Sequence, residues 1–154
     1  FETKNVYHMN DMFMNCSSLK TIDTSKFNTA KVKDMQFMFY NCSSLQKLDV
    51  SNFNTSNVTD MTNMFYNCKL LKNIDLTNFD TSKVTDFSRM FWGCSNFTTL
   101  NLSSFDTAKA WNMGWMFRNC TKLKTITVSD KWVTGTAITN GMFLNCGTDH
   151  VTKI

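Results

Sequence analysis

Apolar residues recur along this chain at a constant interval of 26 positions. The clearest column of equivalent positions is cysteine, and the residue three positions before each cysteine is always phenylalanine. The cysteines are Cys16, Cys42, Cys68, Cys94, Cys120 and Cys146. A period of about 20–50 residues indicates repeats that bury their apolar faces only by stacking on one another. The pattern therefore predicts an array of about six repeats.

Within each repeat, one stretch has the i, i+3, i+4, i+7 spacing of apolar residues that is typical of a helical face. In the second repeat its members are Val32, Met35, Met38, Phe39 and Cys42. The position two residues after the valine is acidic in three repeats, and an acidic residue favours the start of a helix. This column contains Asp34, Asp60 and Asp86, with His8 and Asn112 in the equivalent places. The sequence predicts a helix of about two turns in each repeat.

The residue before each cysteine is asparagine or glycine in every repeat. The members of this column are Asn15, Asn41, Asn67, Gly93, Asn119 and Asn145. Both residue types tolerate a left-handed backbone, which is the usual conformation at the end of a helix. The single glycine indicates that the position requires a backbone conformation more than a side chain. We therefore expect a left-handed residue before each cysteine.

A second apolar pattern, Leu45-x-x-Leu48-x-Val50, has the spacing of a leucine-rich repeat and predicts one short strand in each repeat. The predicted fold class is an α/β solenoid. It is a leucine-rich-repeat-like right-handed coil of about six 26-residue repeats, each with one short parallel strand and one short helix. We assign residues 1–154 to a single array, a fragment of a longer one, with a partial repeat at 1–4. Residues 129–154 form a degenerate or capping repeat, in which Trp132 replaces the usual phenylalanine.

Composition argues against several classes of function. The net charge of +4 is spread along the chain, without the clustered basic residues of a nucleic-acid site. No apolar run reaches the roughly 18–20 residues that cross a bilayer, so we expect no membrane insertion. No Ser-His-Asp or Cys-His arrangement and no phosphate loop points to an enzyme. We expect no catalytic residue, no cofactor and no bound metal.

The cysteines are interpreted as buried free thiols. Stacked copies of one position lie about 5 Å apart, which would allow a disulfide. Their side chains are parallel, however, and this fits the disulfide dihedral of about 90° poorly. No two cysteines are close in sequence and both histidines stand apart from them, so no zinc site is predicted. The spacing alone leaves both redox states open.

The third repeat resembles a known family. The stretch Val58-Thr-Asp-Met-Thr-Asn-Met-Phe-Tyr-Asn-Cys, followed by Leu71-x-x-Ile-Asp-Leu-Thr-Asn-Phe-Asp-Thr, is similar to the BspA-type leucine-rich repeats of bacterial surface proteins. The similarity extends over nearly the whole chain. It implies a secreted or cell-wall-attached protein, extracellular or at the cell surface, with a role in adhesion or host contact. It implies no catalytic residue, because the family motif is structural.

The sheet face is one candidate binding surface. Its outward columns include the residues Lys47, Asp49 and Asp75. Aspartates stacked about 5 Å apart repel one another unless they are paired or bound to a metal. The lysines near enough to neutralise them are Lys20, Lys47 and Lys72. We interpret the column as a solvated, salt-bridged ladder, with a calcium site as the alternative.

Aromatic residues on the predicted helix side form a second candidate surface. Tyr40, Tyr66 and Trp92 share one column, while Trp111 and Trp115 replace polar residues of other repeats. The two tryptophans are expected four residues apart on one helix. Because aromatic side chains anchor many interfaces, Tyr66, Trp92, Trp111 and Trp115 are candidate partner-binding residues. Alternatively, the tryptophans cover the edge near the last repeat or pack on a following domain.

Together these features predict a non-enzymatic surface-protein segment that presents a regular face to a protein or glycan on a host or neighbouring cell. One alternative is a structural spacer or surface-layer element without a specific ligand. Another is an ice- or crystal-binding array, which is suggested by a threonine column. That column consists of Thr29, Thr55, Thr81 and Thr107.

Overall fold

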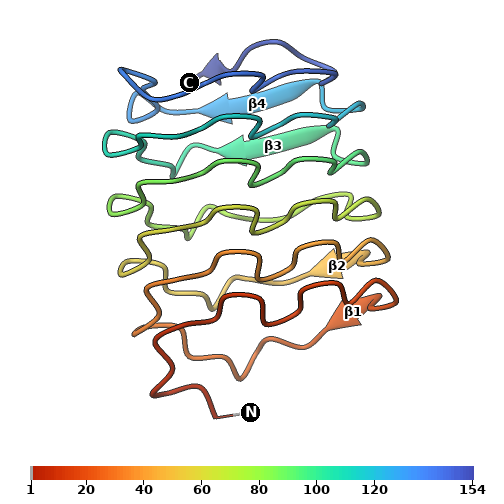
Figure 1. Ribbon diagram of the computed structural model, residues 1–154, viewed down its shortest axis with the longest axis vertical. Helices are drawn as coiled ribbons and strands as arrows, with labels where there is room; N and C mark the ends of the chain where they lie inside the picture. The colour runs from red at the N-terminus through yellow and green to blue at the C-terminus, as the bar shows by residue number, and fades with distance from the viewer. Residues whose placement is uncertain (1) are drawn as a thin grey trace.

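Each coil of the backbone takes up 26 residues and lies directly on the coil before it. The computed structural model describes residues 2–154. Parallel bridges join residues at this interval across neighbouring coils, as at Asp34–Asp60 and Asp60–Asp86. Figure 1 shows the coils stacked along the long axis, with the two chain ends at opposite ends of the stack. The described residues include no helix long and apolar enough to cross a membrane.

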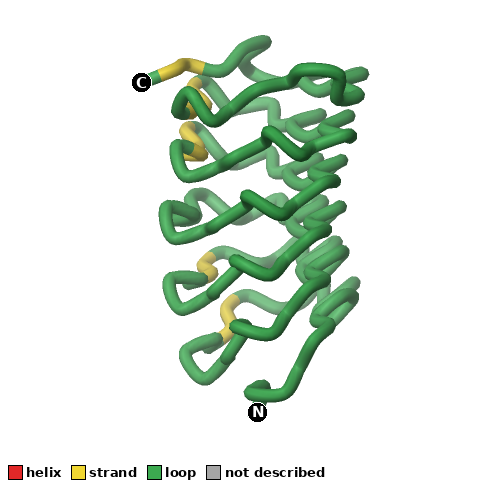
Figure 2. The backbone as a smooth tube through the Cα atoms, turned by 90° about the vertical axis from the view of Figure 1, so that its left-hand side faces the viewer, coloured by secondary structure: helices red, strands yellow, loops and turns green. Residues whose placement is uncertain are grey.

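Short parallel strands lie along one side of the stack, where Figure 2 shows them in yellow. Those within residues 2–154 are β1 (Thr21–Ile22), β2 (Lys47–Leu48), β3 (Thr99–Leu102), β4 (Thr125–Val128) and β5 (Thr152–Lys153). β1 pairs with β2, while β3, β4 and β5 form a second sheet in that order. Residues 71–76, between the two sheets, form no strand, because no amide of residues 72–76 donates to a neighbouring coil.

The predicted fold class is wrong. Residues 2–154 contain no helix, so the protein is not an α/β solenoid with one helix and one strand in every repeat. The stretch predicted as helical is a chain of tight turns. In it, the amides of Met38, Tyr40 and Cys42 donate to carbonyls only three residues earlier, at 2.9–3.3 Å.

The intervening amides of this stretch donate to the next coil. The Phe37 amide donates to the Thr62 carbonyl at 3.0 Å, and the Phe39 amide donates to the Met64 carbonyl at 2.9 Å. Four such bonds, 2.6–3.2 Å long, join each pair of neighbouring coils. An α-helix would use these amides in its own i to i−4 bonds. Here the same donors hold one coil to the next.

Two left-handed residues in each coil are the reason that no helix forms. One is the asparagine or glycine before each cysteine, as predicted, with φ between 57° and 74°. The other lies four residues earlier, with φ between 55° and 61°. This second column consists of Asp11, Phe37, Asn63, Arg89, Trp115 and Gly141. A right-handed helix cannot contain such residues at this spacing, and they turn alternate amides out of the coil.

The column of asparagines is also a ladder of side chains. The side-chain amide of Asn41 donates to the side-chain oxygen of Asn15 at 3.1 Å. The side-chain amide of Asn67 donates to the side-chain oxygen of Asn41 at 2.7 Å. Gly93 interrupts this ladder while keeping the left-handed conformation, at φ 74°. The conformation is therefore common to the whole column, and the amide bonds add to it where asparagine is present.

The apolar residues predicted to face inward do so without a helix. The members of the set that are fully buried, at 0% exposure, are Val32, Met35, Met38, Phe39 and Cys42. Phenyl rings of successive coils stack through the interior from Phe13 to Phe143, with centroids 5.4–5.9 Å apart. In the last repeat Trp132 is buried and packs on Phe117 with a centroid distance of 6.3 Å. The turns therefore present the same spacing of inward residues that a helix would.

All six cysteines are free thiols. The four in the middle of the array are buried, and each donates to the carbonyl of a phenylalanine in the preceding coil at 3.0–3.2 Å. Burial raises the pKa of Cys42 to about 11 and raises that of Cys68 further. Cys16 is exposed and Cys146 is half-buried, so the expectation of uniform burial is wrong for these two.

Replacing Asn63 distinguishes the left-handed backbone from a helix. Alanine is the best helix former but fits a positive φ poorly. We therefore expect Asn63→Ala to lower the free energy of unfolding by about 1 kcal/mol. Asn63→Gly should leave it within about 0.5 kcal/mol of wild type, because glycine adopts this conformation freely. Urea denaturation followed by tryptophan fluorescence measures both, and an alanine variant more stable than the glycine variant would contradict the structure.

The thiols should react in an order set by their exposure. In the folded protein a colourless disulfide reagent that releases a coloured thiolate should modify Cys16 first and Cys146 more slowly. The four buried thiols should react only after unfolding, because burial raises their pKa and excludes the reagent. Cys16→Ser serves as the control and should remove the fast phase alone. Fast reaction of more than two groups would show that the coils open in the native state.

Candidate functional site

Aromatic and arginine side chains form a continuous strip over the turns of successive coils. It combines two neighbouring columns of equivalent residues. One is the second left-handed column described above, and the other lies three positions later in each coil. The aromatic–arginine strip consists of the half-buried residues Phe37, Tyr40, Tyr66, Arg89, Trp92, Trp115 and Arg118. The tight turn that returns the Tyr40 amide to the Phe37 carbonyl, at 2.9 Å, sets the two columns side by side. Their rings lie 5.5 Å apart at the centroids.

The rings of the strip stack from coil to coil. Tyr40 and Tyr66 have centroids 4.5 Å apart and planes only 15° from parallel. Trp92 lies 5.5 Å from Tyr66, and Trp115 lies 6.5 Å from Trp92, both tilted. Burial and the neighbouring Tyr40 raise the pKa of Tyr66. The ring faces are thus turned mainly toward one another, and the strip is held in one arrangement.

Arginine and tryptophan exchange columns between two adjacent coils. Arg89 precedes Trp92 in one coil, whereas Trp115 precedes Arg118 in the next. The exchange places each guanidinium on an indole of the neighbouring coil. The Arg89 Cζ lies 4.6 Å from the Trp115 ring centroid, and the Arg118 Cζ lies 4.5 Å from that of Trp92. Cation–π contacts of this kind contribute about 0.5–2 kcal/mol and fix the positions of both arginines.

Neither arginine is neutralised by a carboxylate within residues 2–154. The ion pairs of that range are His8–Asp34, His150–Asp149 and Lys153–Asp130. The Nε atom of Arg118 is buried and has no hydrogen-bond partner. A guanidinium that is partly removed from water and lacks an anion is costly to hold in place. The strip therefore carries positive charge that the described chain does not compensate.

The two tryptophans predicted to form one outward patch lie in different environments. Trp115 is half-buried, and its indole lies so close to Gly141 that a Cβ there would come within 2.6 Å of the ring. Trp111 is 56% exposed and forms no aromatic pair with Trp115. The helix that was predicted to carry Trp111 and Trp115 one turn apart is absent, so that part of the interpretation is wrong. Only Trp115 belongs to the strip.

The sheet-face residues Lys47, Asp49 and Asp75 are exposed, but they do not form a salt-bridged ladder. The Asp49 carboxylate accepts the Ser51 amide at 2.9 Å, and the Asp75 carboxylate accepts the Thr77 amide at 3.0 Å. The Ser51 amide bond lowers the pKa of Asp49, and the Thr77 hydroxyl, at 2.7 Å, lowers the pKa of Asp75 together with the Thr77 amide. No lysine forms an ion pair with either aspartate in residues 2–154, so the predicted ladder is wrong. Over the same range no cluster of three or more potential ligands is placed to hold a metal ion.

A second aspartate column lies where helix starts were predicted. Asp34, Asp60 and Asp86 are stacked, and each accepts the amide two residues later at 2.7–2.9 Å. Burial raises the pKa of Asp60, and the charges of its two neighbours raise it further, against the bond from Thr62. In the next coil Asn112 takes this position, and its side-chain amide donates to the Asp86 carboxylate at 3.1 Å. The three stacked carboxylates form turns but repel one another.

The threonine column that suggested an ice- or crystal-binding array lies inside the coils. Its members, at 1–2% exposure, are Thr29, Thr55, Thr81 and Thr107. The Thr55 hydroxyl donates to the Asp80 carbonyl and accepts the Asp80 amide, both at 2.9 Å. The other three make the same pair of bonds to the coil that follows. The column joins coils and presents no outer face, so that interpretation is wrong.

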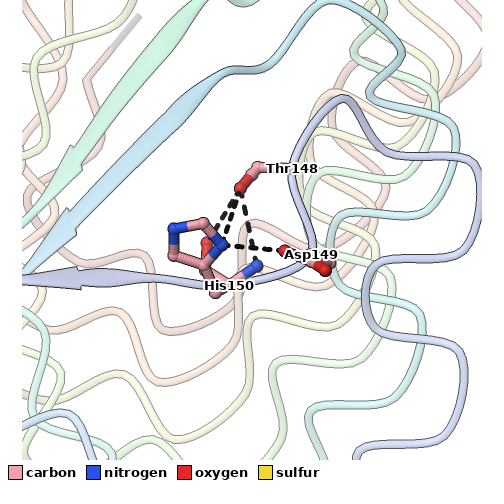
Figure 3. A network of polar contacts seen from close by, with 3 residues as sticks. All are labelled: Thr148, Asp149 and His150. Carbon is pink, nitrogen blue, oxygen red and sulfur yellow. Dashed lines mark hydrogen bonds and ion pairs between the residues drawn. The ribbon is translucent and has the colours of Figure 1, made fainter.

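Thr148, Asp149 and His150 form a local polar network near the C-terminal end (Figure 3). The Nδ1 atom of His150 lies 2.8 Å from the Asp149 carboxylate and 3.4 Å from the Thr148 hydroxyl. A catalytic triad requires the acid on one ring nitrogen and the nucleophile on the other. Both groups here contact the same nitrogen, and His150 and Asp149 are exposed. The geometry is that of a surface turn and does not activate a nucleophile.

The arginines of the strip are functional candidates that the sequence interpretation missed. Arg89 and Arg118 are the only arginines of the chain, and each is exchanged with a tryptophan 26 positions away. This exchange is a signal in the sequence. The helix interpretation hid it, because it grouped Trp115 with Trp111 rather than with the Tyr66 column. Of the predicted residues, the structure brings Tyr66, Trp92 and Trp115 together.

A family model described as "Mycoplasma protein of unknown function, DUF285" matches this chain twice, over residues 1–72 and 44–152. The two matches overlap at residues 44–72 and together extend over nearly all of the sequence. No curated protein and no solved structure matches the chain. The family description states no activity and no ligand, so a function has to be argued from the surface of the protein itself.

Asp60→Asn should stabilise the protein at neutral pH. The raised pKa of Asp60 means that the folded state binds a proton more tightly than the unfolded state does. Its contribution to stability is complete below the unfolded pKa of about 3.9 and is lost as pH rises through the folded pKa. Asparagine keeps the acceptor for Thr62, as Asn112 does for Gly114, and removes the charge. We expect a gain of at most about 1 kcal/mol at pH 7 that disappears near pH 3.

Asp75→Asn is the matched control for this measurement. Hydrogen bonds from Thr77 lower the pKa of Asp75, so its stabilising effect is present above the unfolded pKa and is lost as pH falls. The control should therefore gain nothing at neutral pH. Thermal unfolding of both variants from pH 3 to pH 8 checks the sign. Equal gains at pH 7 would show that the stacked column carries no strain of its own.

Proposed function

The chain belongs to the DUF285 family of Mycoplasma proteins of unknown function, and we propose that it is a non-enzymatic binding scaffold. Its aromatic–arginine strip recognises a partner on a host or neighbouring cell. The observation that carries the proposal is the pair of arginines stacked on tryptophans without a carboxylate partner in the described residues 2–154. The similarity of the repeats to BspA-type surface proteins supports display at the cell surface.

The strip suits binding because it is organised before a partner arrives. Ring stacking and cation–π contacts hold the side chains in one arrangement, and the coils beneath are joined by regular backbone bonds. Binding then costs little side-chain entropy. Tryptophan, tyrosine and arginine are also the residue types that dominate the energetics of protein interfaces. A protein partner is therefore the favoured class.

The sheet face is the weaker candidate. Asp49 and Asp75 accept hydrogen bonds from their own turns, so these carboxylates already have a structural role. The depression beside them, lined by Lys47, Leu48 and Asn73, is shallow and open to solvent. Lys47 and Lys72 on this face are exposed and are not held by ring contacts as the arginines of the strip are. For this reason we assign recognition to the strip.

A structural spacer is the second candidate function. It is favoured by the large share of polar side chains that join one coil to the next, including the buried threonines and the asparagine ladder. In a spacer the strip has no ligand, and repeat number alone sets the biological effect. The two functions therefore differ in what a strip substitution does.

Binding of the fluorescently labelled protein to cultured animal cells separates these functions. We expect saturable binding by wild type and at least about a tenfold loss of affinity for Trp92→Ala, since hot-spot tryptophans cost this much or more. Trp111→Ala is the matched control, because it removes an exposed tryptophan outside the strip. It should bind within about twofold of wild type.

Three results would count against the proposal. Absence of saturable binding by wild type favours the spacer. Equal losses in both variants indicate binding by exposed aromatic side chains in general. Loss of binding in Lys47→Ala but not in Trp92→Ala moves the site to the sheet face. Because Trp92 packs on Tyr66 and Arg118, urea denaturation first has to show that the variant is folded under the binding conditions.

A further inference from the structure

We infer that the partner surface that meets the strip is an acidic segment of a protein, whose carboxylates pair with Arg89 and Arg118. This inference rests on the proposed function and adds the chemistry of the partner. Both arginines of the chain lie in the strip, in adjacent coils, and neither has an anionic partner in residues 2–154. Charge complementarity therefore points to a partner that supplies the anions.

Apart from the buried Nε of Arg118, the donors of both arginines are without hydrogen-bond partners within residues 2–154 and are left for a ligand. Each guanidinium lies over an indole, at 4.5 Å for Arg118 and 4.6 Å for Arg89. Stacking uses the flat face of the group, whereas the N–H donors lie in its plane and project from its edge. A carboxylate can bind two of these donors at once. The stacked arginine is therefore a fixed fork for a carboxylate.

Part of the cost of pairing is already met in the free protein. Both arginines are half-buried, and the Nε atom of Arg118 is closed off from water without a hydrogen-bond partner. A charge that has lost some of its hydration gains more from a nearby anion than one that is fully hydrated. The anion would also neutralise the positive charge that the unpaired guanidinium leaves in the strip.

The stacked rings favour an acidic protein over a glycan or a nucleic acid. Sugars and bases bind aromatic residues mainly through open ring faces. In the strip one face of Tyr40 is taken by Tyr66, and one face each of Trp92 and Trp115 is taken by a guanidinium group. With these faces occupied, the strip offers arginine donors and ring edges, which carry partial positive charge. Such a surface attracts carboxylates, and apolar side chains next to them can pack on the ring edges.

The test uses labelled poly-L-glutamate as the acidic polypeptide, with binding measured by fluorescence anisotropy. The double variant Arg89→Gln/Arg118→Gln should weaken binding at least about tenfold, because it removes both forks. The matched control is Lys47→Gln/Lys72→Gln, which makes the same change of net charge on exposed residues away from the strip. It should weaken binding by no more than about threefold. Arg118→Lys keeps the charge but loses the paired donors of the guanidinium group. We therefore expect a loss of affinity between about threefold and about tenfold.

Two further probes identify the chemical class, namely hyaluronan as a carboxylated glycan and poly-L-lysine as the opposite charge. Wild type should bind poly-L-glutamate more tightly than hyaluronan and should not bind poly-L-lysine. Arginine-dependent binding of hyaluronan that equals that of poly-L-glutamate would overturn the choice of a protein. Equal effects of the arginine and lysine pairs would reduce the interaction to net charge and overturn the inference.

The outcome can be separated from that of the proposed function. If wild type does not bind poly-L-glutamate but binds cells through Trp92, the scaffold function stands and the acidic partner is excluded. If wild type binds neither, both fail. If the double arginine variant proves unfolded in urea denaturation, Arg118→Lys decides alone: affinity equal to wild type overturns the inference, and a severalfold loss supports it.

Discussion

The structure depends on one backbone constraint, the placement of two left-handed residues four positions apart in every coil. Together they divide the amides between them into two sets. One set closes tight turns within the coil, and the other bonds to carbonyls of the next coil. Without this division the stretch would satisfy its own hydrogen bonds as a helix, and the coils would have no continuous backbone connection on this side. The stacked phenylalanines and thiols fill the space that this arrangement encloses.

The same repetition commits many polar groups to the fold. A coil that repeats places like residues on top of one another, so several polar columns bond along the stack or within their own turns. Threonines bond to the following coil, asparagines bond to one another, and aspartates accept the amide two residues on. Arg89 and Arg118 have no ion-pair partner within residues 2–154, and unlike the exposed Lys47 they are half-buried and stacked on indole rings. That combination separates the strip from the rest of the surface.

The repeat interval and the inward residues could be predicted from the sequence, because the inward positions of the core are restricted to apolar residue types in nearly every repeat. Met35, Phe39 and Cys42 are inward as predicted. The local conformation could not be predicted from the same pattern, since inward residues at i, i+3, i+4 and i+7 fit both a helix and this chain of turns. The asparagine before each cysteine did signal a left-handed residue. The other left-handed column did not, because it holds residues as different as Phe37 and Arg89.

The candidate site was only partly predictable for a related reason. The aromatic column of Tyr66 and Trp92 is visible as a repeat. The role of Trp115 depends on which residues neighbour it, and a helix gives the wrong neighbour, Trp111. The threonines and aspartates show the opposite error. The threonine column suggested an ice-binding face and the aspartate column a salt-bridged ladder, whereas Thr55 and Asp49 form hydrogen bonds with backbone groups of the fold itself.

The bonds between coils also give the molecule an electrical axis. At each junction four peptide groups point their N–H toward the later coil and their C=O toward the earlier one. Each peptide carries a dipole of about 3.5 D, and dipoles aligned head to tail add as they do in a helix. A fifth bond at each junction runs the opposite way, as from the Lys33 amide to the Tyr7 carbonyl. The turn side of the stack therefore has a net dipole, positive toward the C-terminal coils and negative toward the N-terminal coils. Residues 2–154 contain no helix, yet they carry a net dipole of the kind usually ascribed to one, directed along the stack and not along the chain.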